Sequence, residues 1–197
     1  MHSLRMARSN LSVDSDVFED FSRQTRRQNK TLFAFANETL STVCKICDEG
    51  GNVAELYPTW RTVSLLKQID VMTLPADFLD TLIAKEYAGD KEGVLRMFWD
   101  LGANLVGVLK FVADDIQGLE DVAKDLSLLL PIKRMKITNL EDDAVEIGIA
   151  GAGKRIESSE CSAEFIKAVL NGYGYSVASQ EVGVGTIRML ARKKHSF

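Results

Sequence analysis

Apolar and polar residues follow two different periods along the chain, and the change of period marks two kinds of secondary structure. In residues 76–130, apolar side chains recur every three to four positions, which is typical of amphipathic helices. From residue 132 onward they largely alternate with polar side chains, which is typical of strands with one buried face. Helices first and strands afterwards predict an α+β fold class.

The strand-rich half is expected to contain two hairpins separated by one helix. The preceding helices are expected at residues 76–87 and 93–112, with a further apolar stripe at 119–130 that Pro131 ends. The four strands are expected at residues 132–138, 144–150, 175–179 and 185–191. A helix at residues 161–171 lies between the pairs, so the predicted order after the first helices is ββαββ.

The first fifty residues read as a short strand followed by two helices. If residues 8–13 are extended, Leu11 and Val13 lie on one face, and the polar residues lie on the other. Asp14 and the residues after it are good N-caps for a first helix, which ends at Asn29 because asparagine tolerates the left-handed conformation. Thr31 is expected to cap a second apolar helix.

A lone strand and two helices cannot bury much apolar surface, and a lone strand leaves both edges unpaired. Two copies would solve both problems, because their strands can pair about a two-fold axis and their helices can share a core. The polar strand face would then display Arg8, Asn10 and Ser12 twice, on a ribbon that fits the DNA major groove. Arginine can pair with guanine and asparagine with adenine, so these residues predict base contacts.

This stretch, about residues 6–47, resembles the ribbon–helix–helix family of DNA-binding proteins, of the Arc, MetJ and CopG type. The resemblance implies a homodimer or higher oligomer with double-stranded DNA as partner. It assigns the base contacts to Arg8, Asn10 and Ser12. It assigns the phosphate contacts to the start of the second helix, at Lys30, Thr31 and Leu32.

The charge distribution agrees with a basic head on an acidic body. The whole chain carries a formal charge of −4, and residues 1–45 carry seven Lys or Arg against five acids. The head is therefore +2, which leaves −6 for residues 46–197. Only the head is expected to face a polyanion.

The body, about residues 58–193, resembles the 4-vinyl-reductase-like ligand-binding domain and its relative in the TRAPP vesicle-tethering subunits. The likeness lies in Gly102 and Gly107 within a long helix, two hairpins, and a helix that opens with Cys161. It implies a domain that binds a small apolar effector or senses a signal; the alternative is a dimerisation domain without a ligand. The domain boundaries expected are 1–48, a linker at 49–57 around Gly50-Gly51, and 58–197.

Two short motifs carry candidate chemistry. Residues 148–154 fit the letters G-x-x-x-x-G-K, but Arg155 follows where a phosphate loop needs Ser or Thr, so a plain connection is favoured over an NTPase. Cys44 and Cys47 form C-x-x-C at the end of the second helix. Burial in the core is the favoured interpretation of both thiols, redox sensing is the next, and metal binding the last.

No catalytic constellation is visible, so the chain is predicted not to be an enzyme and to need no cofactor or metal. The two histidines stand at positions 2 and 195, away from any nucleophile. No signal peptide and no membrane span is apparent, which predicts a cytoplasmic protein. The function predicted is a dimeric, sequence-specific transcriptional regulator. The alternative is a small-molecule-binding or sensor protein whose N-terminal helices only mediate oligomerisation.

Overall fold

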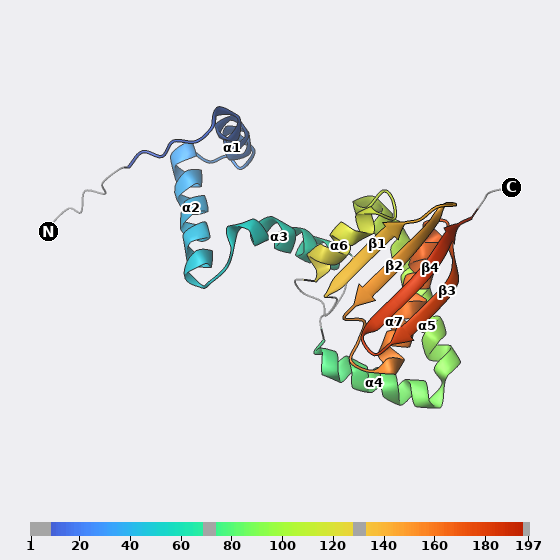
Figure 1. Ribbon diagram of the computed structural model, residues 1–197. Helices are drawn as coiled ribbons and strands as arrows, with labels where there is room; N and C mark the ends of the chain where they lie inside the picture. Colours follow the sequence, from blue (N-terminus) through green and yellow to red (C-terminus); the bar gives the residue numbers. More distant parts are fainter. Residues whose placement is uncertain (1–8, 69–73, 128–132, 195–197) are drawn as a thin grey trace. The chain divides into compact units, whose positions relative to one another are not determined.

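The computed structural model describes residues 9–68, 74–127 and 133–194, and its α+β class agrees with the prediction (Figure 1). The chain divides into two compact units, residues 1–56 and 57–197. The helices are α1 (Ser15–Arg27), α2 (Leu32–Asp48), α3 (Val53–Gln68), α4 (Ala76–Gly89), α5 (Lys91–Val112), α6 (Gly118–Leu126) and α7 (Ile156–Gly172). None of these helices, within the residues described, is long and apolar enough to cross a membrane.

The first unit contains α1 and α2, whose boundaries follow the capping residues of the sequence. Asp14 precedes α1, and the Thr31 side chain accepts a hydrogen bond from the Ala34 amide 3.2 Å away, which caps α2. Asn29 turns the chain between them with φ of 53°, as predicted. The rings of Phe21 and Phe35 stack with centroids 4.7 Å apart and join the two helices.

The predicted N-terminal strand is wrong for the residues that can be examined. Residues 9–14 form no strand, and Leu11, which was expected to face a core, is 70% exposed. An isolated strand satisfies its backbone hydrogen bonds only with a neighbouring strand, and residues 9–56 supply none. Arg8 lies outside the described residues.

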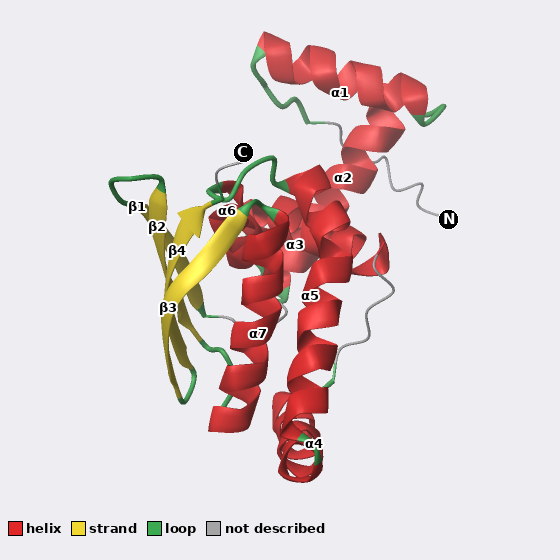
Figure 2. Cartoon of the chain, turned by 90° about the vertical axis from the view of Figure 1, so that its right-hand side faces the viewer, coloured by secondary structure: helices red, strands yellow, loops and turns green. Residues whose placement is uncertain are grey.

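The second unit is built on a four-stranded antiparallel sheet with strand order β1-β2-β4-β3. The strands are β1 (Arg134–Asn139), β2 (Ala144–Ala150), β3 (Tyr175–Gly183) and β4 (Thr186–Lys193). Figure 2 shows α7 lying along one face of the sheet and α5 packed on the far side of α7. The unit therefore has a sheet layer and two helical layers, and within it the helices lie on one face of the sheet only.

The core forms where the sheet meets α7. Alternate residues of the two central strands, Val145, Ile147 and Ile149 of β2 with Ile187 and Met189 of β4, point to the helices and are buried. Their alternation with more exposed neighbours is the period-two pattern that predicted these strands. The same period places the intervening residues on the opposite face.

Two glycines of α5 show why the helical layers fit closely at one place. A Cβ at Gly102 would lie 2.4 Å from the Phe165 carbonyl oxygen of α7, so this crossing requires glycine. A Cβ at Gly107 would meet no atom within 4 Å. Close backbone approach is therefore a property of Gly102 and not of Gly107.

Candidate functional site

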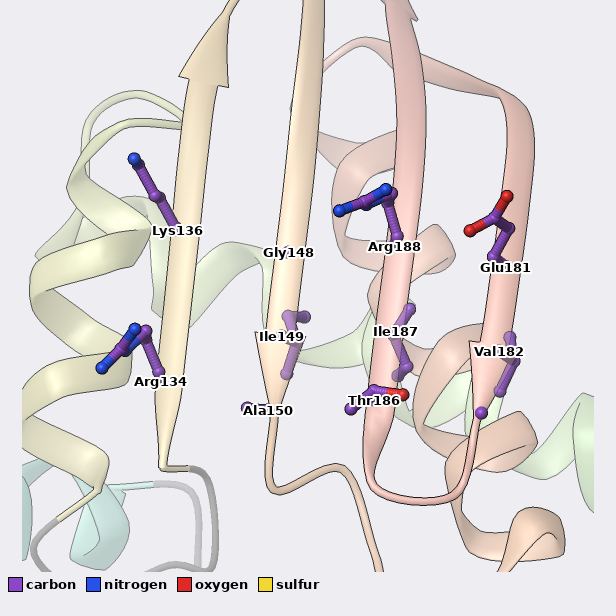
Figure 3. Close-up of a pocket in the computed structure, with 11 residues that line it drawn as sticks. Arg134, Lys136, Gly148, Ile149, Ala150, Glu181, Val182, Thr186, Ile187 and Arg188 are labelled. Atoms are coloured by element: carbon purple, nitrogen blue, oxygen red, sulfur yellow. The ribbon is translucent and has the colours of Figure 1, made fainter.

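The uncovered face of the sheet carries a shallow concavity of about 680 Å³, which we call the sheet-face hollow (Figure 3). Side chains of all four strands contribute to it. Its lining residues are Arg134, Lys136, Gly148, Ile149, Ala150, Glu181, Val182, Gly183, Thr186, Ile187 and Arg188. Ile149 and Ile187 are buried on the helix-covered side, so they contribute mainly backbone to the hollow.

Strand register places a glycine between two cations at the centre of the hollow. Gly148 of β2 pairs with Lys136 on β1 and with Arg188 on β4. The three residues thus form one row across the sheet, with side chains on the uncovered face. A Cβ at Gly148 would meet nothing within 4 Å, so the space above it is open. Below this row, Ala150 and Thr186 continue a floor of small residues.

The cations around the floor differ in whether they already pair with a carboxylate. The Arg188 guanidinium lies 3.4 Å from the Glu146 carboxylate, and Glu181 is its direct cross-strand partner on β3. Figure 3 shows the Arg188 side chain turned toward β2. Lys136 and Arg134, in contrast, form no ion pair with any residue in the described parts of the chain. The hollow therefore offers two unpaired cations, Arg134 and Lys136, and one cation that the Glu146 carboxylate already orients.

Chemically, this arrangement can bind and orient a small molecule. The residues that line the hollow place no histidine, cysteine or serine on its surface, and its hydroxyl comes from Thr186 without a neighbouring base. A nucleophile activated by a general base is the usual requirement for covalent catalysis, and these side chains do not form one.

A second polar cluster joins three helices and has a structural role. Glu160 of α7 accepts hydrogen bonds from the Tyr87 hydroxyl of α4 and from the Lys91 ammonium of α5, the latter over 2.8 Å. Lys91, and then Tyr87, lower the pKa of the Glu160 carboxyl. Burial, and then the bond to Glu160, raises the pKa of Tyr87. These groups hold the end of α4 to the other helices.

The glycine-rich connection between β2 and α7 is closed by protein contacts. The Lys154 amide donates to the Asp80 carboxylate over 3.0 Å, and the Lys154 ammonium lies 2.7 Å from Asp77. The Gly185 amide donates to Ser159 Oγ over 2.9 Å. A phosphate loop needs free amides and a free lysine, so this loop is the plain connection that the sequence favoured.

The described residues that were predicted to contact DNA belong to the first unit, whereas the sheet-face hollow belongs to the second. Asn10 and Ser12 are exposed in residues 9–14, which have no regular structure. Lys30 forms an ion pair with Glu38, Thr31 caps α2, and Leu32 is exposed in its first turn. Lys30 and Thr31 thus have partners within the chain, and Leu32 lies at the surface.

The C-x-x-C cysteines are both exposed, so the favoured interpretation of core burial is wrong. Cys44 and Cys47 lie one turn apart near the end of α2, and redox sensing by them remains a prediction. In the described residues, no group of three or more His, Cys, Asp or Glu could hold a metal ion.

Sequence reasoning missed the sheet-face hollow, although part of its signal was present. Gly148 interrupts an apolar strand pattern, which often marks close approach by a ligand or another backbone. Arg134, Lys136 and Arg188 occupy the polar positions of their strands. Only the register between strands shows that these cations flank the glycine.

No protein-family model matches the chain, and no curated protein was found to be similar to it. Similar solved structures are H-NOX domains. One, from work on the function of heme distortion in the H-NOX family, is 12% identical, covers 68% of this chain and 85% of its own, and has a TM-score of 0.45. Another, from work on H-NOX activation, is 14% identical, covers 66% and 83%, and has a TM-score of 0.43. Likeness at this level carries no argument about function.

The resemblance to ribbon–helix–helix proteins is corrected by these findings. Residues 9–14 lack the strand on which that resemblance depends, and no family model supports either resemblance suggested by the sequence. The interpretation as a DNA-binding transcriptional regulator is therefore wrong, and so is double-stranded DNA as partner. The base contacts assigned to Arg8, Asn10 and Ser12, and the phosphate contacts assigned to Lys30, Thr31 and Leu32, were implied by that resemblance and are not themselves tested by the described residues.

Three side chains of the described residues that could in principle ligate a heme iron, Cys161, Tyr87 and Tyr173, are buried or already hydrogen-bonded within the protein. Heme iron is usually held by histidine, a cysteine thiolate or tyrosine, and both histidines, at positions 2 and 195, lie outside the described residues. Cys161 is fully buried, and burial, with nearby Glu160, raises the pKa of its thiol to about 11, so it stays protonated at neutral pH. The Tyr87 and Tyr173 hydroxyls donate to protein acceptors.

Proposed function

We propose that this chain is a small-molecule-binding or sensor protein without enzymatic activity, which takes its ligand in the sheet-face hollow. Its two N-terminal helices mediate association with a second copy. The observation that carries the proposal is Gly148, a strand glycine that leaves open space between Lys136 and Arg188 on the uncovered face of the sheet.

Self-association is favoured by the composition of the first unit. Its helices have no buried apolar residue, whereas Val17, Phe18, Leu32 and Leu40 are all exposed beside the stacked Phe21 and Phe35. Two helices of this length bury too little apolar surface to be stable alone. A second copy supplies a matching apolar surface, because the same side chains recur in it, and four helices can share one core.

Ligand binding is tested by a thermal-shift screen of soluble metabolites against the full chain, with Gly148→Val as the matched variant. Valine suits a strand and its Cβ has room, so the variant is expected to fold, but its side chain occupies the space above residue 148. Compounds that stabilise the wild type should lose their effect on Gly148→Val. If no compound stabilises the wild type, or every stabilising compound acts equally on the variant, binding in the hollow is disproved.

Self-association is tested by sedimentation velocity of the full chain. Wild type is expected to be dimeric at micromolar concentration, and Phe18→Glu monomeric, because a charge would be buried in the shared core. Gln24→Glu, an exposed polar position on α1, is the control and should remain dimeric. A monomeric wild type would contradict this part of the proposal without affecting the ligand site.

A further inference from the structure

Resting on the proposed function, we infer that the ligand of the sheet-face hollow is a small oxyanion. It carries one phosphate or carboxylate group, which is held between Lys136 and Arg188 above Gly148, with a short apolar body over Ala150. The inference combines the spacing of the cations, the empty glycine position and the balance of charge around it.

The spacing of the two cations suits one oxyanion. Lys136 and Arg188 are separated by the single strand β2, and neighbouring strands lie about 4.8 Å apart, so their Cα atoms are roughly 10 Å apart. Both side chains are long and leave the same face of the sheet. Figure 3 shows the Arg188 guanidinium turned toward β2 and the Lys136 side chain turned away from it. A phosphate or carboxylate centred over β2 is therefore within reach of the guanidinium directly, and of the ammonium when the flexible Lys136 side chain changes rotamer.

Gly148 serves no evident purpose in the fold. Its φ is not in the left-handed region, and a Cβ there would meet no atom, so neither backbone conformation nor packing requires glycine. Glycine also weakens the interior of a strand relative to residues with side chains. What it provides is space: any larger side chain would stand between the two cations where the oxyanion is proposed to lie.

The charge balance favours a small anion over a polyanion. The row and its neighbours carry Arg134, Lys136 and Arg188 against Glu146 and Glu181, a net of one positive charge. A nucleic acid or other polyanion would bring its further charges close to the two carboxylates, where they are repelled. The Glu146 carboxylate orients the Arg188 guanidinium, so less freedom is lost when it binds.

The small residues beside the cations define the rest of the ligand. Ala150 and Thr186 pair with each other in the next row of the uncovered face, below Gly148. Their short side chains leave room for a few apolar atoms, and the Thr186 hydroxyl can donate or accept one hydrogen bond. Phenyl phosphate and benzoate have this form, and benzyl alcohol is a neutral molecule of similar shape.

The experiment follows amide shifts of the isotope-labelled full chain during titration with each of these three compounds. Phenyl phosphate or benzoate should shift the Gly148 amide and saturate, whereas benzyl alcohol should not. Lys136→Met and Arg188→Met should each weaken binding by about tenfold, because each removes one charge-assisted hydrogen bond. Gly148→Val should abolish binding. Lys85→Met, at an exposed position on α4, removes a charge of the same kind and should change nothing.

The outcomes separate this inference from the proposed function. One outcome is that benzyl alcohol binds as well as the anions, with its binding blocked by Gly148→Val but not by the methionine variants. In that case the hollow binds a neutral ligand, and only the anion inference fails. If none of the probes shifts amides of the hollow, the inference fails, and the metabolite screen then decides the proposed function. Preference for phenyl phosphate or for benzoate identifies which oxyanion the hollow takes.

Discussion

The two faces of the sheet are built from alternate residues of the same strands, yet they obey opposite requirements. On the covered face, Ile147 and Met189 are 0% exposed and pack with residues of α7. One position along each strand, Gly148 and Arg188 lie on the uncovered face beside open space. Packing restricts the first pair tightly, whereas the second pair is free of packing constraints.

This difference shows where the chain can hold a binding site without loss of stability. Residues of the covered face can change only at the cost of cavities or overpacking. Residues of the uncovered face can carry charges, or a missing side chain, at little cost. The unpaired cations and Gly148 are therefore informative, because the fold does not demand them.

The largest expected effect compares the faces directly. Ile147→Ala should lower the free energy of unfolding by about 2–5 kcal/mol, because it opens a cavity at a fully buried position. Arg188→Ala on the uncovered face should change it by no more than about 0.5 kcal/mol. Urea denaturation of both variants provides the measurement. Equal losses would mean that the two faces are assigned wrongly.

The next largest effect compares two glycines of α5, in the helical layers that cover the sheet. Gly102→Ala should destabilise by about 1–3 kcal/mol, because its methyl group would overlap the Phe165 carbonyl of α7. Gly107→Ala, on the same helix but in open space, should stabilise by about 0.5–1 kcal/mol. Thermal unfolding should move the two midpoints in opposite directions; movement in the same direction would exclude a close crossing at Gly102.

A smaller effect depends on pH and tests the polar ties among α4, α5 and α7. Glu160→Gln should cost about 1 kcal/mol at pH 7, since it removes the ion pair with Lys91, which is partly exposed. The folded-state pKa of Glu160 is lowered below the ordinary value of 4.5. Its stabilisation is therefore complete above that value and is lost as pH falls through the folded pKa. Unfolding curves at pH 7 and pH 3 should show a smaller difference between variant and wild type at the lower pH.

The smallest effect is a difference in reactivity between exposed and buried thiols, which involves no change in stability. Cys44 and Cys47 are exposed on α2, whereas Cys161 is fully buried in α7 with its thiol pKa raised by burial. A thiol reagent should react rapidly with two groups in the native protein and with the third only after unfolding. Rapid reaction of all three groups in the native protein would contradict the packing of α7.

Redox sensing by Cys44 and Cys47 stays a prediction, and we expect it to proceed through a reversible disulfide between them. Residues three apart on a helix bring their sulfurs to one face, but the bond has strict geometry and requires the last turn to loosen. Mass spectrometry of the native protein after mild oxidation should show a loss of two hydrogens within one chain. A mixture of cross-linked copies instead would indicate that the thiols of different chains meet.

The sequence by itself determined most of the local elements, although it did not predict α3, which begins within the expected linker at residues 49–57. Period-two alternation located the paired strands. The N-cap position of Asp14, the capping hydrogen bond of Thr31 and the left-handed Asn29 located the boundaries of α1 and α2. These signals depend on neighbours in sequence, so they are visible without the fold. The predicted strand at residues 8–13 failed, because alternation over a few residues does not supply a partner for backbone hydrogen bonds.

Only the tertiary structure decided which residues come together. Lys136, Gly148 and Arg188 are separated by 12 and 40 positions in sequence, and the register of three strands brings them into one row. The same holds for Gly102, whose need for glycine comes from the backbone of α7. Contacts of this kind depend on how elements pack, which local periodicity does not encode.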